Sequence, residues 1–159
     1  MTKDESIRLY LEGYHKLKGC LDELPSEMWD FKPSPDKWSV REIVIHIMDS
    51  EINAYVRCRK IIAETGSTIT TYDQDKWAQA LNYKDHNIDI AVEVFKFLRM
   101  ITHDLLMILP DSTWENFIIH PERGKIKLTD WLKEYIVHIN KHCGQMQRNL
   151  DEWQKQNKS

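Results

Sequence analysis

Hydrophobic residues recur every three or four positions along most of this chain, and that period constrains the fold more than any other feature. It is the pattern of helices that turn one face toward a core. The five glycines and five prolines fall mostly between the periodic stretches. The sequence therefore predicts an all-α protein, a four-helix bundle forming a single domain over residues 1–159. The expected helices span residues 3–24, 39–65, 88–109 and 129–153.

Local signals mark the ends of these helices and the connectors between them. Pro25 and Pro110 end the first and third helices, and residues 39–42 form a capping box that opens the second. The connection between residues 66 and 87 is longer than most helix-to-helix loops and is predicted to contain a short helix over residues 75–81. Residues 111–127 form the other long connector, in which a short hairpin is expected.

Charge and hydropathy exclude two classes of partner. The 159 residues contain 22 Lys+Arg and 25 Asp+Glu, a net charge of −3, whereas nucleic-acid binders are usually basic. The longest apolar runs are far shorter than the roughly 20 residues that span a bilayer. No apolar segment follows Met1, so no signal peptide is expected. We expect a small-molecule substrate, with no nucleic-acid or membrane partner.

The three cysteines are Cys20, Cys58 and Cys143. They are too few and too scattered for a disulfide framework, and their odd number leaves one unpaired. Each is expected to be a small buried apolar residue, in a reducing, cytoplasmic setting.

The helix expected over residues 129–153 carries the sharpest chemical signal. Its inner stripe includes Tyr135, Ile139, His142 and Met146, so His142 takes a core position by periodicity. His138 lies one turn earlier and leaves the same face, because positions i and i+4 are neighbours on a helix. Neutral imidazoles at this spacing are a common source of two metal bonds.

A third ligand has to come from another helix, and His46 lies in the middle of the nearly all-apolar second helix. The alternative is that these are core histidines satisfied by hydrogen bonds. However, each buried ring nitrogen left unpaired costs about 1–3 kcal/mol. Of the remaining histidines, three are expected to be solvated, namely His15, His86 and His103. The fourth, His120, is expected to make a structural hydrogen bond in a turn.

Four segments together resemble the DinB/YfiT-like superfamily: residues 38–51, 72–77, 120–124 and 131–146. Members are four-helix bundles that hold a divalent metal with one histidine of the second helix and an H-x-x-x-H pair of the fourth. The resemblance implies that His46, His138 and His142 bind one divalent metal ion, which could be zinc, nickel, iron or manganese. It does not imply DNA binding.

Any general base must come from outside the histidine pair. The glutamate of an H-E-x-x-H metalloprotease is missing, so that class is excluded. Glu51 could orient a ligand histidine or accept a proton, although a salt bridge to Arg57 or Arg8 is an equal alternative. Asp73 and Asp75 lie in the long connection that could overhang the site, and such loop carboxylates are usually just solvated.

The resemblance allows two kinds of enzyme, and a third possibility is a non-catalytic protein that binds a metal or small ligand. The family includes transferases and an isomerase that use low-molecular-weight thiols, and other members are described as metal-dependent hydrolases. The lack of an obvious base favours thiol transfer, because a metal can itself deprotonate a coordinated thiol. Some tryptophans could line the substrate pocket, namely Trp38, Trp77 and Trp131.

The third helix has a second apolar face that cannot all reach one core. Its residues are Ala91, Val94, Ile101 and Ile108. Such a face can form a symmetric contact, so the sequence predicts a homodimer.

Overall fold

The computed structural model describes residues 1–157 and confirms the four-helix bundle. The long helices are α1 (Lys3–Asp22), α2 (Val40–Ala63), α4 (Ile88–Met107) and α5 (Leu128–Asn157). The connectors contain a short helix, α3 (Gln74–Ala80), and a hairpin of β1 (Phe117–His120) and β2 (Gly124–Lys127). Three short 3₁₀ turns complete them, at Ser26–Met28, Tyr83–Asp85 and Asp111–Glu115.

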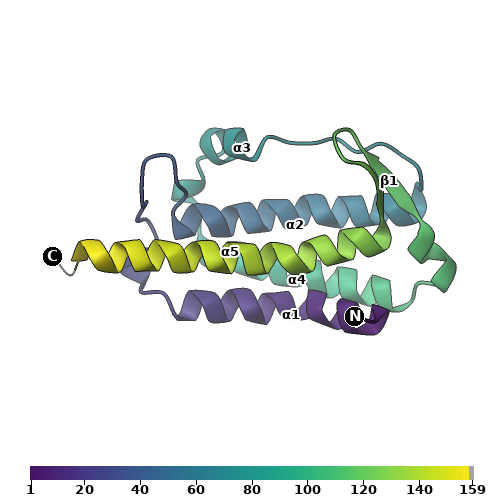
Figure 1. Cartoon of the computed structure of the whole chain (residues 1–159), viewed down its shortest axis with the longest axis horizontal. Coiled ribbons are helices and arrows are strands. Elements are labelled where there is room, and N and C mark those ends of the chain that lie inside the picture. The colour runs from purple at the N-terminus through teal and green to yellow at the C-terminus, as the bar shows by residue number, and fades with distance from the viewer. Residues whose placement is uncertain (158–159) are drawn as a thin grey trace.

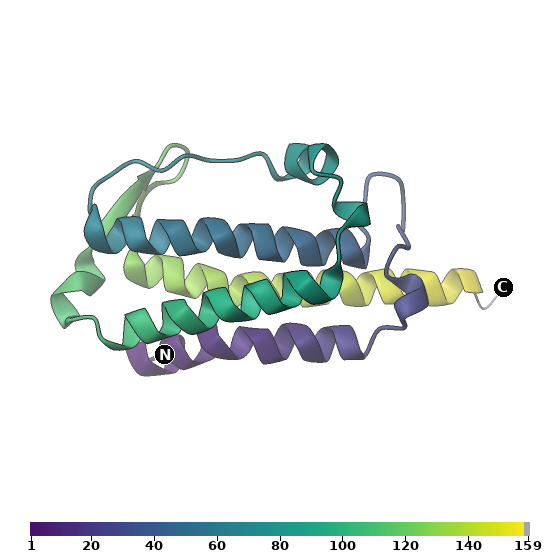
Figure 2. The ribbon, with the colours of Figure 1, turned by 180° about the vertical axis from the view of Figure 1, so that it is seen from behind.

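Each long helix packs against two others, in the cyclic order α1, α4, α2, α5. Figure 1 shows α5 in front of α4, with its C-terminal end projecting beyond the bundle, and Figure 2 shows α4 from behind. The hairpin lies at one end of the bundle, and α3 lies above α2 toward the other end. Helices α2 and α5 therefore face each other below α3.

The predicted capping signals form as expected. Ser39 and Glu42 make a reciprocal capping box at the start of α2, and Thr2 and Glu5 make another at the start of α1. Helices α1 and α4 end about one turn before Pro25 and Pro110, near the predicted positions. The short helix and the hairpin also lie within the predicted connectors.

The long connection that follows α2 is hydrogen-bonded to the hairpin. The Gly66 amide donates to the Phe117 carbonyl at 2.7 Å, and the Ile69 amide donates to the Ile119 carbonyl at 3.1 Å. Gly66 has φ +85°, a left-handed conformation that favours glycine. The hairpin is in turn joined to α5 by the bidentate Arg123–Glu134 ion pair. The connection thus has a fixed start before it runs over α2 to α3.

The burial of α4 differs in part from the outer face predicted for this helix. Ala91 is only 2% exposed and packs in the core, so its assignment to an outer face was wrong. Val94 is half-buried, whereas Ile101 and Ile108 are exposed. The buried stripe of α4 includes Arg99, a residue that hydrophobicity alone assigns to the surface.

The cysteine expectation was wrong for two of the three residues. Cys20 of α1 and Cys143 of α5 form a disulfide, with Cα atoms 5.9 Å apart, because these two helices pack side by side. Sequence spacing gives no sign of this neighbour relation. Cys58 is free and buried, as expected, and burial raises the pKa of its thiol to about 12.

Among residues 1–157, no helix combines the length and the hydropathy that crossing a membrane requires.

Candidate metal centre

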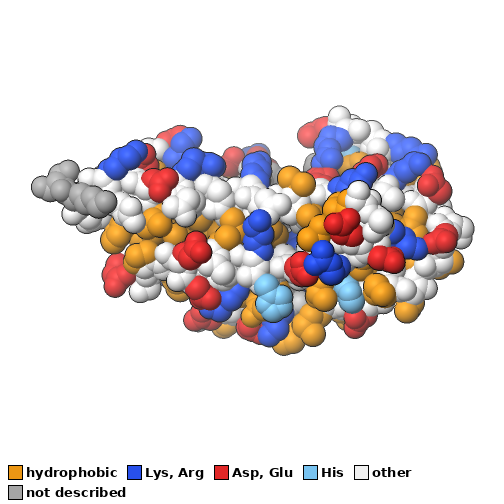
Figure 3. Space-filling view, turned by 60° about the horizontal axis from the view of Figure 1, so that its bottom comes forward, with side chains coloured by type: hydrophobic (Ala, Val, Ile, Leu, Met, Phe, Trp, Pro, Cys, Tyr) orange, Lys and Arg blue, Asp and Glu red, His pale blue; other side chains and the backbone are white. Residues whose placement is uncertain are grey.

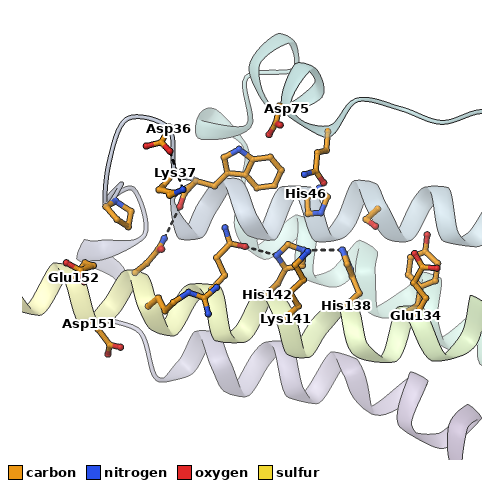
Figure 4. A pocket seen from close by; sticks show the side chains of 18 of the residues that line it. Asp36, Lys37, His46, Asp75, Glu134, His138, Lys141, His142, Asp151 and Glu152 are labelled. Atoms are coloured by element: carbon orange, nitrogen blue, oxygen red, sulfur yellow. Dashed lines mark hydrogen bonds and ion pairs between the residues drawn. The ribbon is translucent and has the colours of Figure 1, made fainter. Parts of the chain in front are cut away.

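Three imidazoles meet between α2 and α5, as Figure 4 shows. His46 comes from α2, and His138 and His142 lie one turn apart on α5. One nitrogen from each ring lies within 4.8 Å of the others. The ring centroid of His46 is 5.5 Å from that of His138 and 4.9 Å from that of His142. We refer to these three side chains as the triad.

Two ring nitrogens of the triad have no hydrogen-bond partner in the protein. The His142 Nδ1–H donates to Gln145 Oε1 at 2.9 Å, which leaves the lone pair of His142 Nε2 facing His138 Nε2 at 3.0 Å. The Nδ1 atoms of His46 and His138 are buried and have no hydrogen-bond partner. Two nitrogens bonded to one zinc-sized ion at about 2.0–2.1 Å lie about 3.0–3.4 Å apart. The donor set and the Nε2 separation therefore fit a divalent cation.

Burial keeps the triad in the protonation state that metal binding needs. Burial, with a smaller contribution from neighbouring imidazoles, lowers the pKa of His46 to about 3 and that of His138 to about 2. Burial also lowers the pKa of His142, although the hydrogen bond to Gln145 opposes this shift. At neutral pH all three rings are neutral, and each can offer a lone pair.

The triad opens into a cavity of about 840 Å³ between α2, α5 and the segment leading into α3. Trp38 lies on its wall with its ring centroid 4.9 Å from that of His46, and the Tyr135 ring lies 6.0 Å from that of His138. Since one edge of the triad faces this space, a ligand held there could reach a small molecule. A closed structural metal site would leave no such access.

Glu51 does not reach the triad, so its predicted role as a base or orienting group is wrong. Its carboxylate is 1% exposed and pairs with Arg99 Nη2 at 3.1 Å, and it also accepts the Tyr10 hydroxyl. The alternative of a salt bridge was correct in kind, but the partner is neither Arg57 nor Arg8. Arg8 pairs with Glu12 on the surface.

Arg99 is the centre of this second buried polar group. Its Nη1 donates to the Tyr10 carbonyl at 2.6 Å and its Nη2 to the Tyr135 carbonyl at 2.7 Å. Gly13 makes room for it, because a Cβ at that position would overlap Arg99 Nη1. We refer to Arg99, Glu51 and Tyr10 as the Arg99 cluster. The sequence shows Arg99 and Glu51 as charged residues in largely apolar helices, but their pairing follows only from the packing of α2 against α4.

The other predicted candidates divide between the cavity and the rest of the fold. Asp73 caps the N-terminus of α3, while Asp75 lines the cavity. Trp38 lines it as predicted, but Trp77 is not among the lining residues and contacts the Tyr72 ring, with centroids 4.5 Å apart. Trp131 is 2% exposed in the core, so its proposed pocket role was wrong.

The remaining histidines lie outside the triad. His15 is exposed, His103 contacts Asp104, and the His86 ring contacts the Leu81 carbonyl. His120 is buried and accepts a hydrogen bond from the Glu122 amide at 3.2 Å, the structural bond expected in its turn.

The fold and the triad together define a helical bundle with a candidate metal centre between two of its helices. The chain belongs to the DinB superfamily, whose family model matches residues 9–146. A protein of Oceanobacillus iheyensis named "Putative metal-dependent hydrolase" is 30% identical over 134 residues, covering 80% of this chain and 77% of the relative. A Bacillus cereus protein with the same description is 29% identical over 128 residues, covering 80% of this chain and 73% of its own.

Two solved structures have a similar fold. One is described as YfiT from Bacillus subtilis, a probable metal-dependent hydrolase with an unusual four-helix bundle topology. It has a TM-score of 0.85 and 25% identity, covering 92% of this chain and 85% of its own. The other, a mycothiol-dependent maleylpyruvate isomerase, has a TM-score of 0.68 and 10% identity. The match covers 90% of this chain but only 60% of the isomerase, and it indicates the fold alone.

Proposed function

We propose that His46, His138 and His142 bind one divalent metal ion and that the protein is a metal-dependent enzyme acting on a small molecule. The observation that carries this proposal is the buried triad, whose neutral rings have unsatisfied nitrogens at the edge of a cavity. The names of the Oceanobacillus and Bacillus relatives, which include metal-dependent hydrolase, support the same proposal.

The chemistry we propose is transfer of a low-molecular-weight thiol to an electrophile. A divalent ion supplies Lewis acidity, which lowers the pKa of a thiol or a water that reaches it. Thiol transfer needs no side-chain base, and the residues around the triad offer none in direct contact. Glu51 is held by Arg99, and Glu134 is held by Arg123. In this proposal the chain positions the rings through Gln145 and covers His46 with Trp38.

Hydrolysis is the second candidate, because Asp75 lies on the cavity wall and forms no ion pair within residues 1–157. A carboxylate at this place could accept a proton from water. The two chemistries differ in the substrate they consume and in whether Asp75 is needed.

One assay separates them. Metal-loaded protein is incubated with chlorodinitrobenzene and a panel of small thiols, and separately with esters and amides. Thiol transfer forms a carbon–sulfur bond and releases one chloride and one proton for each conjugate. We expect conjugation that falls more than about tenfold in His138→Ala and is unchanged in the surface control His15→Ala. If the protein hydrolyses an ester or amide, loses that activity in Asp75→Asn and forms no thiol conjugate, hydrolysis replaces thiol transfer as the proposed chemistry.

Metal content tests the ligand set independently of activity. We expect about one divalent ion per chain by elemental analysis, and loss of most of it in His46→Ala, His138→Ala and His142→Ala. Full occupancy in His138→Ala contradicts the ligand assignment.

The outer face of α4 supports the proposal of a homodimer. Ile101 and Ile108 are exposed, as are Phe97 and Met107 on the same helix. Hydrophobic side chains also reach the surface between charged ones on the face drawn in Figure 3. We expect light scattering to give the mass of two chains at tens of micromolar, and Ile101→Glu to give one chain. A monomeric parent protein contradicts the proposal.

A further inference from the structure

Of the two guanidiniums on the cavity wall, that of Arg148 is exposed, and the other is half-buried and has no acidic partner among residues 1–157. Four other arginines each pair with a carboxylate, namely Arg8, Arg41, Arg99 and Arg123. Arg57 of α2 is half-buried and forms no ion pair within residues 1–157. Its hydrogen bond to the Tyr135 hydroxyl is long, at 3.4 Å, and therefore weak. A partly desolvated guanidinium without an acid is a candidate anion-binding group.

Two phenols lie beside this guanidinium. The charge of Arg57 acts on the pKa of both Tyr135 and Tyr72, which places both hydroxyls near it. A phenol has an ordinary pKa of about 10, so both hydroxyls keep their protons at neutral pH and can donate. Tyr72 hydrogen-bonds Ser50, and all of these side chains line the same cavity as the triad.

The acidic residues of the cavity do not neutralise the positive charge of Arg57 at the end of the cavity near Tyr135. Glu134 makes two hydrogen bonds to Arg123, at 2.7 and 2.8 Å. Figure 4 shows Asp36, Asp151 and Glu152 at the opposite end of the cavity, beyond His142, and Asp75 above His46. Two further carboxylates act on these phenols, but Asp49 accepts the Tyr83 hydroxyl and Glu51 pairs with Arg99. Arg57 is therefore a cation without its own carboxylate at the end of the cavity near Tyr135.

We propose that Arg57 and Tyr135 bind an anionic group, a carboxylate or a phosphate, on the small molecule that reacts at the triad. This inference rests on the proposed function for the reacting end of that molecule. A guanidinium can donate two parallel hydrogen bonds to either anion, and the phenol can add a third. Tyr135 and His138 are about 4.5 Å apart along the axis of α5. The anionic group is thus separated from the reacting atom by only a few bonds, so the substrate is a short anionic molecule.

Calorimetric titration with inorganic phosphate and with succinate tests the subsite, using protein both as purified and after metal removal. We expect saturable binding of at least one anion in both forms. Arg57→Gln should weaken it about tenfold or more, Tyr135→Phe should weaken it less, and Arg57→Lys should keep part of it. The control is Arg148→Gln, an exposed arginine on the same cavity wall, which should bind like the parent protein.

Succinate and phosphate distinguish the two anions, and metal content separates the two proposals. If neither anion saturates the parent protein, or if Arg57→Gln binds as tightly as the parent, the subsite is refuted. If the metal content is normal in that case, the proposal of a metal centre still stands. Arg57-dependent anion binding in a protein that binds no metal would refute the proposed function and keep the subsite.

Discussion

Two buried polar groups contact neighbouring turns of α5, the Arg99 cluster at the Tyr135 carbonyl and the triad through His138 and His142, and they are completed in opposite ways. The Arg99 cluster is closed except at Arg99 Nε, which has no partner: Arg99 donates to two carbonyls and to Glu51, and Glu51 also accepts from Tyr10. The triad is open, because its neutral rings line a cavity and His46 makes no hydrogen bond within residues 1–157. Burying polar groups is tolerated when they are paired with one another, or when a ligand completes them. The difference distinguishes a structural group from a candidate binding site.

The largest expected effect is on the closed group. Arg99→Met leaves the Glu51 carboxylate buried without its cation, so unfolding free energy should fall by about 3–5 kcal/mol. Denaturant titration followed by circular dichroism measures it, with the exposed Arg148→Met as control. Adding Glu51→Leu to Arg99→Met should recover much of the loss, because no charge then remains buried. A parent-like stability of Arg99→Met would remove the distinction between the two groups.

Chelation should affect the open group by a smaller amount. A metal that binds only the native state adds RT ln(1+[L]/Kd), about 2.7 kcal/mol when free metal is 100 times Kd. We expect a chelator to lower the unfolding free energy by about that amount while circular dichroism still shows a folded bundle. His138→Ala should be insensitive to the chelator. Complete unfolding on chelation would mean that the metal is structural.

Per imidazole and per pH unit, the smallest expected effect is the pH dependence of metal-free stability. An unfolded imidazole binds a proton below about pH 6.5, whereas burial lowers the pKa of His46 to about 3 and that of His138 to about 2. The unfolded state thus binds more protons in this interval, and stability falls as pH falls from 6.5. Each such imidazole contributes up to about 1.4 kcal/mol per pH unit.

Denaturant titrations between pH 6.5 and 4.5 measure that slope. His138→Ala should reduce it by one imidazole's contribution, and the exposed His15→Ala should leave it unchanged. An equal slope in His138→Ala and the parent protein would mean that His138 is not kept neutral by burial.

The open group was accessible from the sequence because its signal lies within single helices. The spacing of His138 and His142 places both on one face of α5 by periodicity, and His46 is conspicuous in an apolar helix. The four helices follow from the same period, together with proline and capping signals. Local patterns of this kind need no knowledge of which helices are neighbours.

The closed group and the disulfide depend on how the helices pack, and the sequence does not state this. Arg99 replaces a hydrophobic residue on the buried stripe of α4, so a reading based on hydrophobicity misplaces that stripe. Glu51 could not be matched to Arg99 without knowing that α2 and α4 are adjacent. The same holds for Gly13, whose missing side chain matters only because Arg99 lies against it.

The disulfide between α1 and α5 also changes the chain's connectivity. Its two cysteines are 123 positions apart, so α2, α3, α4 and the hairpin all lie within one covalent ring. A single protease cut in a connector inside that ring, such as residues 64–73, opens the ring but leaves both fragments joined. Such a nicked molecule migrates as one species in a denaturing gel without reductant, and it separates into two only when the sulfur bridge is reduced.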